Sequence, residues 1–343
     1  MAKNSSDIST AISFTAKPIF EFYSLFSEAE ILEIIYALEV RQEIPLKYSY
    51  KGRGAKIWDD FYLKYIIPKW YRTSNVEIDL LKDNFAYINS NSRSSEKINV
   101  IDVGSGNSYP VKNFISRLNK LNRINKYVAL DVSDELLKVS RKNFQKWFPL
   151  IEFVSQAIDI ENNCISPDLM NDKTEIYTTA NVILHLGVTI GNHQNRIKVF
   201  KNFKASMGKN DFLVFTNEIG SNSTWDEKAR GGCGYHAREI YEWIKNNLGI
   251  RDEDCELIRK YDLAIDSVVA NMKFCHNYTI NFNYQGIDKN VTFSKGEEIT
   301  IWRHHKHEIP ELLQEIEQAG LQLSHYTTNK YSSHIMAICQ VAK

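Results

Sequence analysis

Residues 98–108, INVIDVGSGNS, decide the fold class, because an apolar run leads directly into a glycine turn. Four apolar residues make up the run: Ile98, Val100, Ile101 and Val103. Such a run is typical of a strand that is buried on both faces of a parallel sheet. A helical pattern follows at residues 111–118. A strand, a glycine turn and a helix start let backbone N–H groups approach a nucleotide-like ligand closely, so we predict a ligand at this turn.

The glycine turn departs from the dinucleotide-binding fingerprint G-x-G-x-x-G, because Tyr109 occupies the third glycine position. What remains is an acidic residue just before a short turn, in the pattern D-x-G-S-G-N. This pattern favours S-adenosyl-L-methionine, which carries cationic ammonium and sulfonium groups and has no pyrophosphate. The candidate cofactor contacts in this segment are Asp102, Gly104, Ser105, Gly106 and Asn107. A glycine-rich turn without a ligand is the alternative, since short G-x-G turns are common.

Strands and helices alternate from residue 98 to residue 217, which is typical of an α/β fold with a doubly wound, Rossmann-like parallel sheet. The other strands are predicted at residues 126–130, 151–156, 175–186 and 211–217. Their carboxyl ends lie at one edge of the sheet, where open α/β sheets bind ligands.

Two of these strand ends carry acidic residues with a possible cofactor role. Asp131 ends the second strand and suits the ribose hydroxyls of a nucleotide, although it could equally be a charge at the start of the next helix. Asp159, with Ile158 beside it, follows the third strand, and its carboxylate could accept the exocyclic amine of adenine. Asp131, Ile158 and Asp159 therefore join the candidate cofactor contacts.

A second, α+β domain is predicted outside this sheet. After Glu218 the alternation stops, and residues 261–291 have the pattern of antiparallel strands in tandem. Residues 321–327 and 334–341 predict an antiparallel hairpin that closes the sheet. We predict a cofactor-binding domain at 76–219 and 306–343, a substrate-binding domain at 16–75 and 220–305, and a flexible N-terminus at 1–15.

Two helix starts can be read from capping patterns. Ser27 is followed three residues later by Glu30, which predicts a capping box and a helix through Leu38. Asn75 is predicted to cap a helix that continues to about Ile88.

The composition argues against several classes of partner and location. Lysine plus arginine and aspartate plus glutamate both total 42, so no net charge attracts nucleic acid or an anionic membrane. No apolar run approaches the ~18 residues of a membrane-spanning helix, and no signal-peptide pattern is evident. The five cysteines are widely spaced and form no C-x-x-C pair, which predicts reduced thiols in a cytoplasmic protein. The composition leaves the oligomeric state open.

Aromatic residues crowd the segment between residues 44 and 71. They are Tyr48, Tyr50, Trp58, Tyr62, Tyr65, Trp70 and Tyr71. They could wall a pocket for an amine, because the faces of aromatic rings attract cations. Packing between domains is the simpler reading of the residue types alone.

Histidines 304, 305 and 307 raise the question of a metal site. On a strand, His305 and His307 would share a face while His304 points away, so three ligands from this run would be awkward. His185 and His193 lie elsewhere, and no spacing matches a zinc signature. We predict no metal.

Six segments carry a resemblance to a known family. They are IPLKYSYKGRGAKIWDDF (44–61), IIPKWYRTSNVEIDLL (66–81), VIDVGSGNS (100–108), LDVS (130–133), GVTIGN (187–192) and FSKGEEI (293–299). In these segments the chain resembles the histidine Nα-methyltransferases of ergothioneine biosynthesis and their fungal relatives that methylate a prenylated tryptophan. The resemblance covers most of the chain from about Ile44, and GVTIGN is its most specific match.

The resemblance implies S-adenosyl-L-methionine as the cofactor and an amino acid or its derivative as the substrate. It also implies that Asn192 holds the amino-acid group of the substrate and that Tyr71 contacts the substrate. A second substrate tyrosine of the family has no clear counterpart here, and Trp225 lies nearest to its position.

The chain departs from the family after FSKGEEI. The histidine-specific members have a glutamate and a serine that grip the imidazole, and these positions are Trp302 and His304 here. Tryptophan cannot accept a hydrogen bond from an imidazole N–H, because its only polar atom is a donor. A flatter or more apolar substrate side chain could stack on Trp302 instead. We therefore predict a substrate other than histidine.

Together these observations predict an N-methyltransferase that acts on the α-amine of an amino acid or an amino-acid-derived small molecule. The methyl group would pass directly to a neutral amine in an SN2 reaction, which needs in-line geometry above all. The predicted catalytic residues are Tyr71, Asn192 and His304, and the general base stays open between His304 and His305. The predicted substrate contacts are Tyr48, Trp58, Tyr71, Asn192, Trp225, Trp302 and His304.

Three alternatives stay open from the sequence. An O-, C- or peptide methyltransferase would keep the same cofactor and change the acceptor. A catalytically inactive nucleotide-binding scaffold would keep the fold alone. A dehydrogenase is disfavoured, because the third glycine and a pyrophosphate site are missing.

Overall fold

The computed structural model describes residues 13–69, 75–92, 95–170, 178–224 and 231–342. The chain divides into two compact units. The sheet unit comprises Leu46–His236, Lys260–Val269 and Arg303–Lys343, and the smaller unit comprises Met1–Pro45, Ala237–Arg259 and Ala270–Trp302. The assignment of substrate binding to a separate domain stays a prediction.

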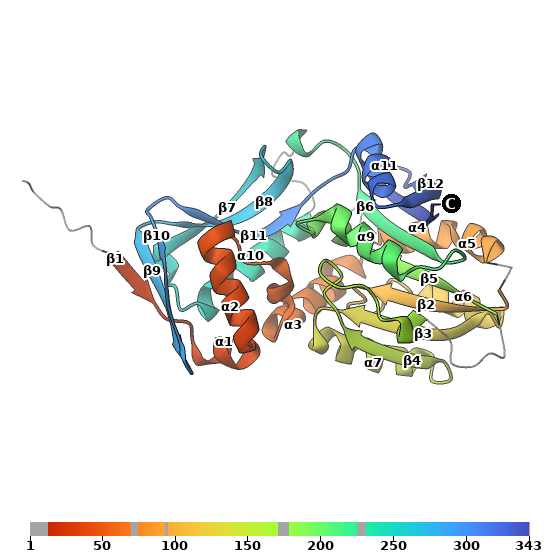
Figure 1. Ribbon diagram of the computed structural model, residues 1–343, viewed down its shortest axis with the longest axis horizontal. Coiled ribbons are helices and arrows are strands. Elements are labelled where there is room, and N and C mark those ends of the chain that lie inside the picture. The colour runs from red at the N-terminus through yellow and green to blue at the C-terminus, as the bar shows by residue number, and fades with distance from the viewer. Residues whose placement is uncertain (1–12, 70–74, 93–94, 171–177, 225–230, 343) are drawn as a thin grey trace, which may run out of the picture. The chain divides into compact units, whose positions relative to one another are not determined.

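The sheet unit is built around a seven-stranded sheet with the strand order β12-β13-β6-β5-β2-β3-β4 (Figure 1). Its strands are β2 (Lys97–Val103), β3 (Ile124–Asp131), β4 (Glu152–Ala157), β5 (Thr179–His185), β6 (Phe212–Glu218), β12 (Leu321–Thr328) and β13 (His334–Val341). Strands β2 to β6 run parallel to one another, whereas β13 runs antiparallel to both β6 and β12. The predicted doubly wound sheet and its closing hairpin are therefore confirmed.

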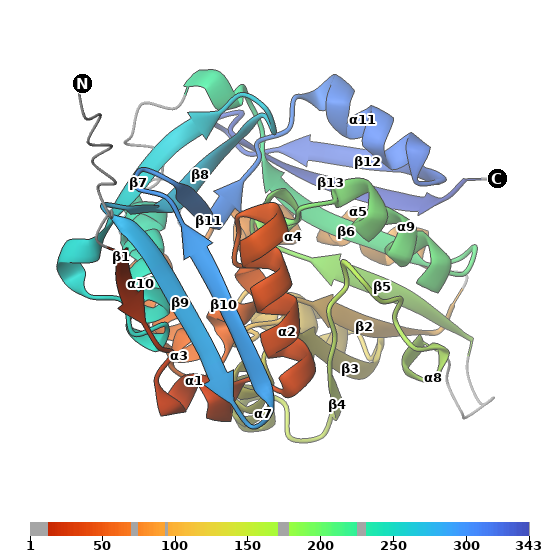
Figure 2. The same ribbon diagram turned by 60° about the vertical axis from the view of Figure 1, so that its left-hand side comes forward.

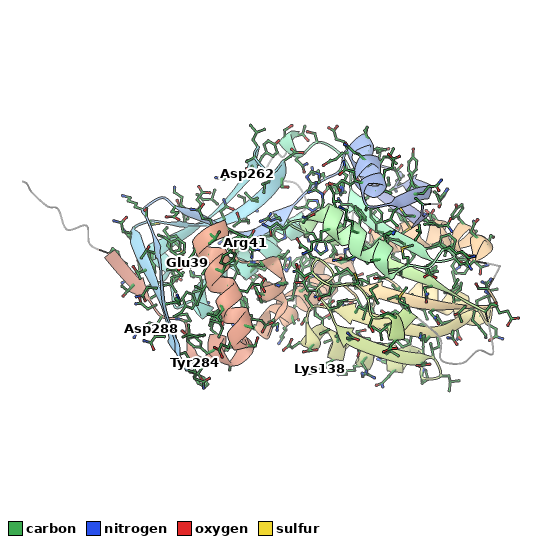
Figure 3. The ribbon with its side chains drawn as sticks, in the orientation of Figure 1. Glu39, Arg41, Lys138, Asp262, Tyr284 and Asp288 are labelled. Atoms are coloured by element: carbon green, nitrogen blue, oxygen red, sulfur yellow. The ribbon has the colours of Figure 1, made fainter. Side chains whose placement is uncertain are left out.

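Alternate residues of β2 face two different hydrophobic cores, as the apolar run predicts. Val100 packs into the core that also holds residues of α4 (Val76–Asp83), α5 (Phe85–Asn91), α6 (Lys112–Lys120) and α7 (Asp134–Trp147). Ile101 packs into the core formed with α8 (Pro167–Met170), α9 (Arg196–Ser206) and α11 (Ile309–Gln318). The helices keep their polar faces outside, as Lys138 of α7 shows (Figure 3).

One predicted helix is interrupted. Asn75 is the N-cap residue of this helix, as predicted, but its backbone is left-handed with φ of 62° and its side chain makes no capping hydrogen bond. The helix also ends at Asn84, which separates α4 from α5. The Leu80 carbonyl accepts both the side-chain amide of Asn84, at 2.8 Å, and the backbone N–H of Asn84, at 3.0 Å. The predicted fourth strand, 175–186, begins at Thr179 in the described residues.

The smaller unit contains α1 (Phe20–Leu25), α2 (Glu28–Tyr36) and most of two three-stranded sheets (Figure 2). One sheet has the order β1-β9-β10, with β1 (Ser13–Ala16) parallel to β9 (Asn277–Tyr284), and β10 (Ile287–Phe293) antiparallel to β9. The other has the order β11-β8-β7, with β7 at Cys255–Asp262, β8 at Ser267–Phe274 and β11 at Glu298–His304. The predicted capping box of Ser27 and Glu30 is present at the start of α2.

Tyrosine stacking adds to the packing of the smaller unit. Tyr23 of α1 stacks on Tyr284 of β9, with 4.4 Å between the ring centroids. Tyr284 is labelled in Figure 3. The long helix α10 spans Gly231–Asn247. In the described part of the chain we find no helix with the length and apolar character needed to cross a membrane.

Candidate active site

The carboxyl edge of the seven-stranded sheet collects the polar residues on which a site can be built. Gly104 follows β2, Asp131 ends β3, Asp159 follows β4, His185 ends β5 and Glu218 ends β6. These strands are parallel, so the five positions share one edge.

The glycine turn after β2 is held by backbone and carboxylate contacts from β3. The N–H groups of Gly104 and Ser105 both donate to the carbonyl of Leu130, at 2.8 and 3.0 Å. The Gly106 N–H donates to Oδ2 of Asp131 at 2.9 Å. Gly106 has φ of +51°, and a Cβ there would lie 2.3 Å from the Trp58 ring. Glycine is therefore required where Trp58 packs on the turn.

Two buried carboxyl groups flank this turn. Burial raises the pKa of Asp131 to about 6, against the opposing effect of hydrogen bonds from the backbone of Gly106 and Ser133. Burial raises the pKa of Asp102 to about 7, and the Tyr127 hydroxyl donates to its carboxylate at 2.6 Å. Asp131 thus organises the turn, while Asp102 is bonded inside the sheet unit; their cofactor contacts stay predictions.

The aromatic segment, from Leu46 onward, bonds to the carboxyl edge of the seven-stranded sheet at two points. It forms a 3-10 turn, η2 (Leu46–Tyr50), and α3 (Arg53–Phe61). Lys47 forms an ion pair with Asp159, with 3.0 Å between Nζ and Oδ2. The Asn107 amide donates to Asp59 of α3 at 2.8 Å. The segment therefore spans from the predicted adenine contact to the glycine turn.

Lys47 and Asp59 were missed by the sequence reasoning, although both lie in the quoted segment IPLKYSYKGRGAKIWDDF. Among the predicted contacts in this segment, Tyr48 is almost fully buried. Trp58 is half-buried and stacks on Tyr62, with 5.4 Å between the ring centroids. Tyr48 therefore contributes to packing, and Trp58 lies at the turn.

Two histidines and a glutamate form a chain of hydrogen bonds behind the loop that carries Asn192. His185 Nδ1 lies 2.9 Å from the carbonyl of Val103, and its Nε2 lies 3.3 Å from Nε2 of His193. His193 Nδ1 in turn lies 3.2 Å from Glu161. Burial lowers the pKa of His185 to about 3, with a further effect of the nearby His193, so His185 is neutral at pH 7.

The carbonyl and carboxylate oxygens at the two ends of this chain can only accept hydrogen bonds, and this determines where His185 carries its proton. A carbonyl accepts, so the neutral His185 carries its proton on Nδ1 and presents a lone pair on Nε2. His193 places one ring nitrogen toward this lone pair and the other toward the Glu161 carboxylate. His193 therefore connects His185 to the Glu161 carboxylate, with 3.2 Å between its Nδ1 and Glu161 Oε2.

We expect the Glu161→Gln protein to be less stable than the wild type at pH 7 by on the order of 2–3 kcal/mol. Burial alone would raise the pKa of Glu161, but the hydrogen bond and charge of His193 and the N–H groups of Asn195 and Gln194 lower it to about 2. Because the folded pKa is depressed, this stabilisation is present above the ordinary value of 4.5 and is lost as the pH falls towards 2.

Urea unfolding of both proteins at pH 7 and pH 3 measures this difference, with the exposed Glu317→Gln exchange as the control. The difference between wild type and Glu161→Gln should shrink at pH 3. An equal difference at both pH values would contradict this contribution of the Glu161 carboxylate.

The loop after β5 brings Asn192 against His304. The 3-10 turn η4 (Thr189–Asn192) ends at Asn192, and its Gly191 carbonyl accepts the N–H of His305 at 2.8 Å. A Cβ on Gly191 would lie 2.3 Å from the His305 carbonyl, so only glycine allows this close approach. As a result, Asn192 Oδ1 lies 3.3 Å from Nδ1 of His304.

Glu218, at the end of β6, joins Asn192 and His304 in a second group of polar side chains, the Asn192 cluster. Its Oε2 lies 3.1 Å from Nε2 of His304, and its Oε1 lies 3.8 Å from Nζ of Lys306. Sequence reasoning brought Asn192 and His304 together but missed Glu218. The signal was available, because Glu218 directly follows the predicted fifth strand, at the ligand-binding edge.

His305 and His307, which were considered above as metal ligands, bind acidic residues of α11. β11 ends at His304, so His305 and His307 follow the strand and do not lie on it. His305 Nε2 lies 2.9 Å from Glu311, and His307 Nε2 lies 3.0 Å from Glu315. Within the described residues no three His, Cys, Asp or Glu side chains come together as a ligand group for a metal ion.

The remaining predicted contacts divide into three groups. Ile158 donates its backbone N–H to the carbonyl of Asp131 at 2.8 Å, so it lies at the carboxyl edge of the sheet, where the cofactor is predicted to bind. Trp302 belongs to the smaller unit and is 8% exposed. Tyr71 and Trp225 lie outside the described residues.

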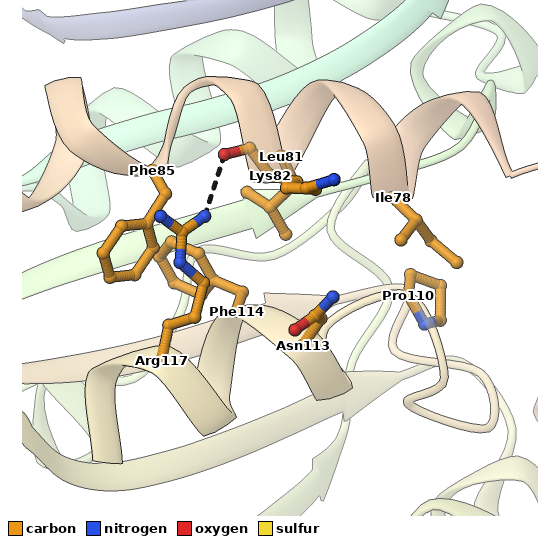
Figure 4. A pocket seen from close by; sticks show the side chains of 8 residues that line it. All are labelled: Ile78, Leu81, Lys82, Phe85, Pro110, Asn113, Phe114 and Arg117. Atoms are coloured by element: carbon orange, nitrogen blue, oxygen red, sulfur yellow. Dashed lines mark hydrogen bonds between the residues drawn. The ribbon is translucent and has the colours of Figure 1, made fainter. Parts of the chain in front are cut away.

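A surface pocket lies apart from these clusters, between α4, α5 and α6 (Figure 4). The residues that line it are Ile78, Leu81, Lys82, Phe85, Pro110, Asn113, Phe114 and Arg117. The Arg117 guanidinium covers the Phe85 ring at 3.8 Å and donates to the Lys82 carbonyl at 3.0 Å. None of the predicted site residues lines this pocket.

The chemistry of the glycine turn fits a bound polar ligand. The Ser105 hydroxyl is buried and has no hydrogen-bond partner among the described residues. Buried hydroxyl groups are normally paired, so a ligand at the turn would supply the missing partner. The turn also brings the Asp131 carboxylate to the same place.

These features define a class of protein that binds a nucleotide-type ligand at the carboxyl edge of a seven-stranded sheet. An antiparallel hairpin closes this sheet. A family model described as histidine-specific, S-adenosylmethionine-dependent methyltransferase matches residues 28–341. The chain belongs to this family, and the family named from the sequence segments is confirmed. It is a methyltransferase with S-adenosyl-L-methionine as its cofactor.

Comparison with other proteins adds distant similarities only. A methyltransferase from Clostridium acetobutylicum ATCC 824, described as S-adenosylmethionine-dependent, is 14% identical, with a TM-score of 0.41, over 92% of this chain and 100% of the other. The CcbJ methyltransferase from Streptomyces caelestis is 10% identical, with a TM-score of 0.42, over 76% and 89% of the two chains. A search of curated proteins found no match.

Proposed function

We propose that this methyltransferase transfers a methyl group from S-adenosyl-L-methionine to the α-amine of an amino acid or an amino-acid-derived small molecule other than histidine. The observation that carries the proposal is the cluster of Asn192, His304 and Glu218 at the carboxyl edge of the sheet. An amine presents N–H donors, and the amide oxygen of Asn192 and the carboxylate of Glu218 are acceptors for such donors.

The glycine turn and the Asn192 cluster would bind different molecules. Gly104, Ser105, Gly106 and Asp131 would hold the cofactor, which supplies an electrophilic methyl group on a sulfonium sulfur. Asn192 would orient the amine, with Tyr71 as its predicted partner. Orientation is the main requirement of a direct SN2 transfer, because no covalent enzyme intermediate is formed.

Trp302 supports the exclusion of histidine. The family's histidine-specific pattern, as the sequence resemblance implies it, has a hydrogen-bond acceptor at this position. An indole offers one N–H donor and an apolar face, and it cannot accept from an imidazole N–H. An aromatic or apolar substrate side chain suits that surface better.

Replacing Asn192 with alanine should reduce kcat/KM for the amine by about 10- to 100-fold, because a charge-assisted hydrogen bond contributes ~1.5–3 kcal/mol. Steady-state kinetics with mass detection of the product measures the effect. Cofactor affinity, measured by titration calorimetry, should stay within about twofold of the wild type.

Asn113→Ala provides the matched control, because Asn113 is exposed on α6 and lines the separate pocket. If Asn192→Ala keeps full turnover and full affinity for the amine, the role of Asn192 is wrong.

A further inference from the structure

Asn217, the last residue but one of β6, is a completely buried amide beside the Asn192 cluster. Its Nδ2 lies 3.0 Å from the carbonyl oxygen of His305 and 2.7 Å from Nδ1 of His307. A Cβ built on Gly191 would lie 3.0 Å from Oδ1 of Asn217, so the amide packs directly against the turn η4, which ends at Asn192. One side chain therefore contacts both this turn and the segment that follows β11.

The neighbouring groups determine which way the Asn217 amide faces. The carbonyl oxygen of His305 can only accept, so the NH₂ group faces it, and the second N–H of this group points to Nδ1 of His307. Nδ1 of His307 is then the acceptor, and Nε2 carries the ring proton and donates to Glu315 at 3.0 Å. Burial lowers the pKa of His307, which agrees with a neutral ring.

This orientation leaves one polar atom of Asn217 without a partner. Its Oδ1 has no hydrogen-bond partner among the described residues, and an unpaired buried acceptor costs ~1–3 kcal/mol. The two N–H bonds offset this cost, because each supplies a donor to an acceptor on a buried residue, His305 or His307. The connection that these two bonds make is therefore the reason for an amide at this position.

Backbone hydrogen bonds attach the same segment to the carboxyl edge of the sheet. The N–H of His305 donates to the carbonyl of Gly191 at 2.8 Å, and the N–H of His307 donates to the carbonyl of Glu218 at 3.1 Å. His304 directly precedes this segment, so its ring is held against the other members of the Asn192 cluster. The Asn217 amide closes the arrangement from below, because it touches both sides of the contact between Gly191 and His305.

We infer that Asn217 is a positioning residue of the acceptor site, which places the Asn192 amide by holding the Gly191 turn against residues 305–307. Asn217 is buried and does not itself touch the acceptor. This inference rests on the proposed function, because it assigns the contact with the amine to Asn192. Direct methyl transfer depends on in-line geometry, so a small displacement of Asn192 slows the reaction although no reacting group is lost.

A double-mutant cycle tests whether Asn217 acts through Asn192. Asn217→Leu keeps the approximate size of the side chain and removes both donors. It should reduce kcat/KM for the amine by about 10- to 100-fold, because a misplacement of about 1 Å has an effect of this size. Cofactor affinity, measured by titration calorimetry, should stay within about twofold of the wild type. In the Asn192→Ala background the same exchange should change kcat/KM by less than about twofold, because the group that it positions is gone.

Two results of the cycle would overturn the inference. Unchanged kcat/KM of Asn217→Leu would show that the amide positions nothing, and an equal loss in both backgrounds would show that it only supports the fold. If Asn192→Ala itself keeps full activity, the proposed role of Asn192 fails, and this inference fails with it. A loss in Asn192→Ala without coupling to Asn217→Leu contradicts the inference alone.

Asn181→Leu is the matched control, because Asn181 is a buried asparagine of β5 near the opposite end of the parallel strands. Its amide donates to Asp211 at 3.0 Å, so the exchange also removes a buried hydrogen bond. Asn181→Leu should lower Tm and leave KM for the amine within about twofold of the wild type. Asn217→Ala is the second variant for the cycle, to be used if Asn217→Leu does not fold.

A further measurement uses the wild-type protein and needs no substrate. Protein labelled with ¹⁵N-histidine is examined by long-range ¹H–¹⁵N correlation at pH 7.5, and the His307 signals are assigned by their loss in His307→Gln. A neutral ring with its proton on Nε2 is expected. A ring protonated on Nδ1 would mean that the Asn217 amide does not donate to it, and would overturn the inference even if no amine is methylated.

Discussion

Gly106→Ala is expected to bind S-adenosyl-L-methionine about 10- to 100-fold more weakly than the wild type. The new methyl group would lie 2.3 Å from the Trp58 ring, so the ring or the turn must move. In addition, Gly106 has φ of +51°, a left-handed conformation that costs another residue ~1–2 kcal/mol. Both effects act on the turn whose N–H is bonded to Asp131. Titration calorimetry with the cofactor measures the loss.

A double-mutant cycle separates the collision from the backbone strain. In the Trp58→Ala background the collision partner is gone, so adding Gly106→Ala should cost less than it does in the wild type. Gly220→Ala is the control for strain alone, because Gly220 has φ of +132° and nothing within 4 Å of its Cβ position. Unchanged cofactor affinity of Gly106→Ala would remove the turn from the cofactor site.

Arg196→Leu is expected to lower the free energy of unfolding by about 3–5 kcal/mol, because it leaves a buried carboxylate without its arginine partner. Arg196 of α9 lies 2.7 Å from Glu315 and 3.2 Å from Glu311, both on α11. Burial would raise the pKa of Glu315, but His307 and Arg196 together lower it to about 2, so it is ionised at pH 7. Thermal unfolding should show a fall in Tm of roughly 4–7 °C for a chain of 343 residues.

The controls for Arg196→Leu use the same two helices. Lys201→Ala changes an exposed lysine of α9 and should leave Tm almost unchanged. Adding Glu315→Leu to Arg196→Leu should recover part of the loss, because it removes the unpaired charge. A Tm of Arg196→Leu equal to that of the wild type would mean that the ion pair contributes nothing to folding.

The parts of this fold that could be predicted depend on local sequence. The apolar run of β2, the glycine turn and the alternation that follows are patterns of neighbouring residues, and they led to the correct sheet. The capping box of Ser27 and Glu30 is likewise read within four residues. The helix from Asn75 was predicted less well, because it divides at Asn84, whose side chain donates to Thr327 far along the chain, and no spacing rule reveals that contact.

The contacts that complete the candidate site join residues far apart in the chain. Lys47 is 112 residues from Asp159, and His304 is 86 residues from Glu218. A single sequence carries no spacing signal for such pairs, because they depend on the way the sheet brings strand ends together. The acidic strand ends were therefore found as candidates, whereas their partners became visible only in the structure.

Incubation of the wild-type protein with S-adenosyl-L-methionine and a panel of amines tests the central claim most directly. The panel contains the twenty amino acids, small aromatic amines and the decarboxylated amino acids, and products are read by mass. We expect a gain of one to three methyl masses on the α-amine of one aromatic or apolar acceptor, and no product from histidine. Methylation of histidine in preference to every other acceptor, or methylation at oxygen or carbon, would contradict the account.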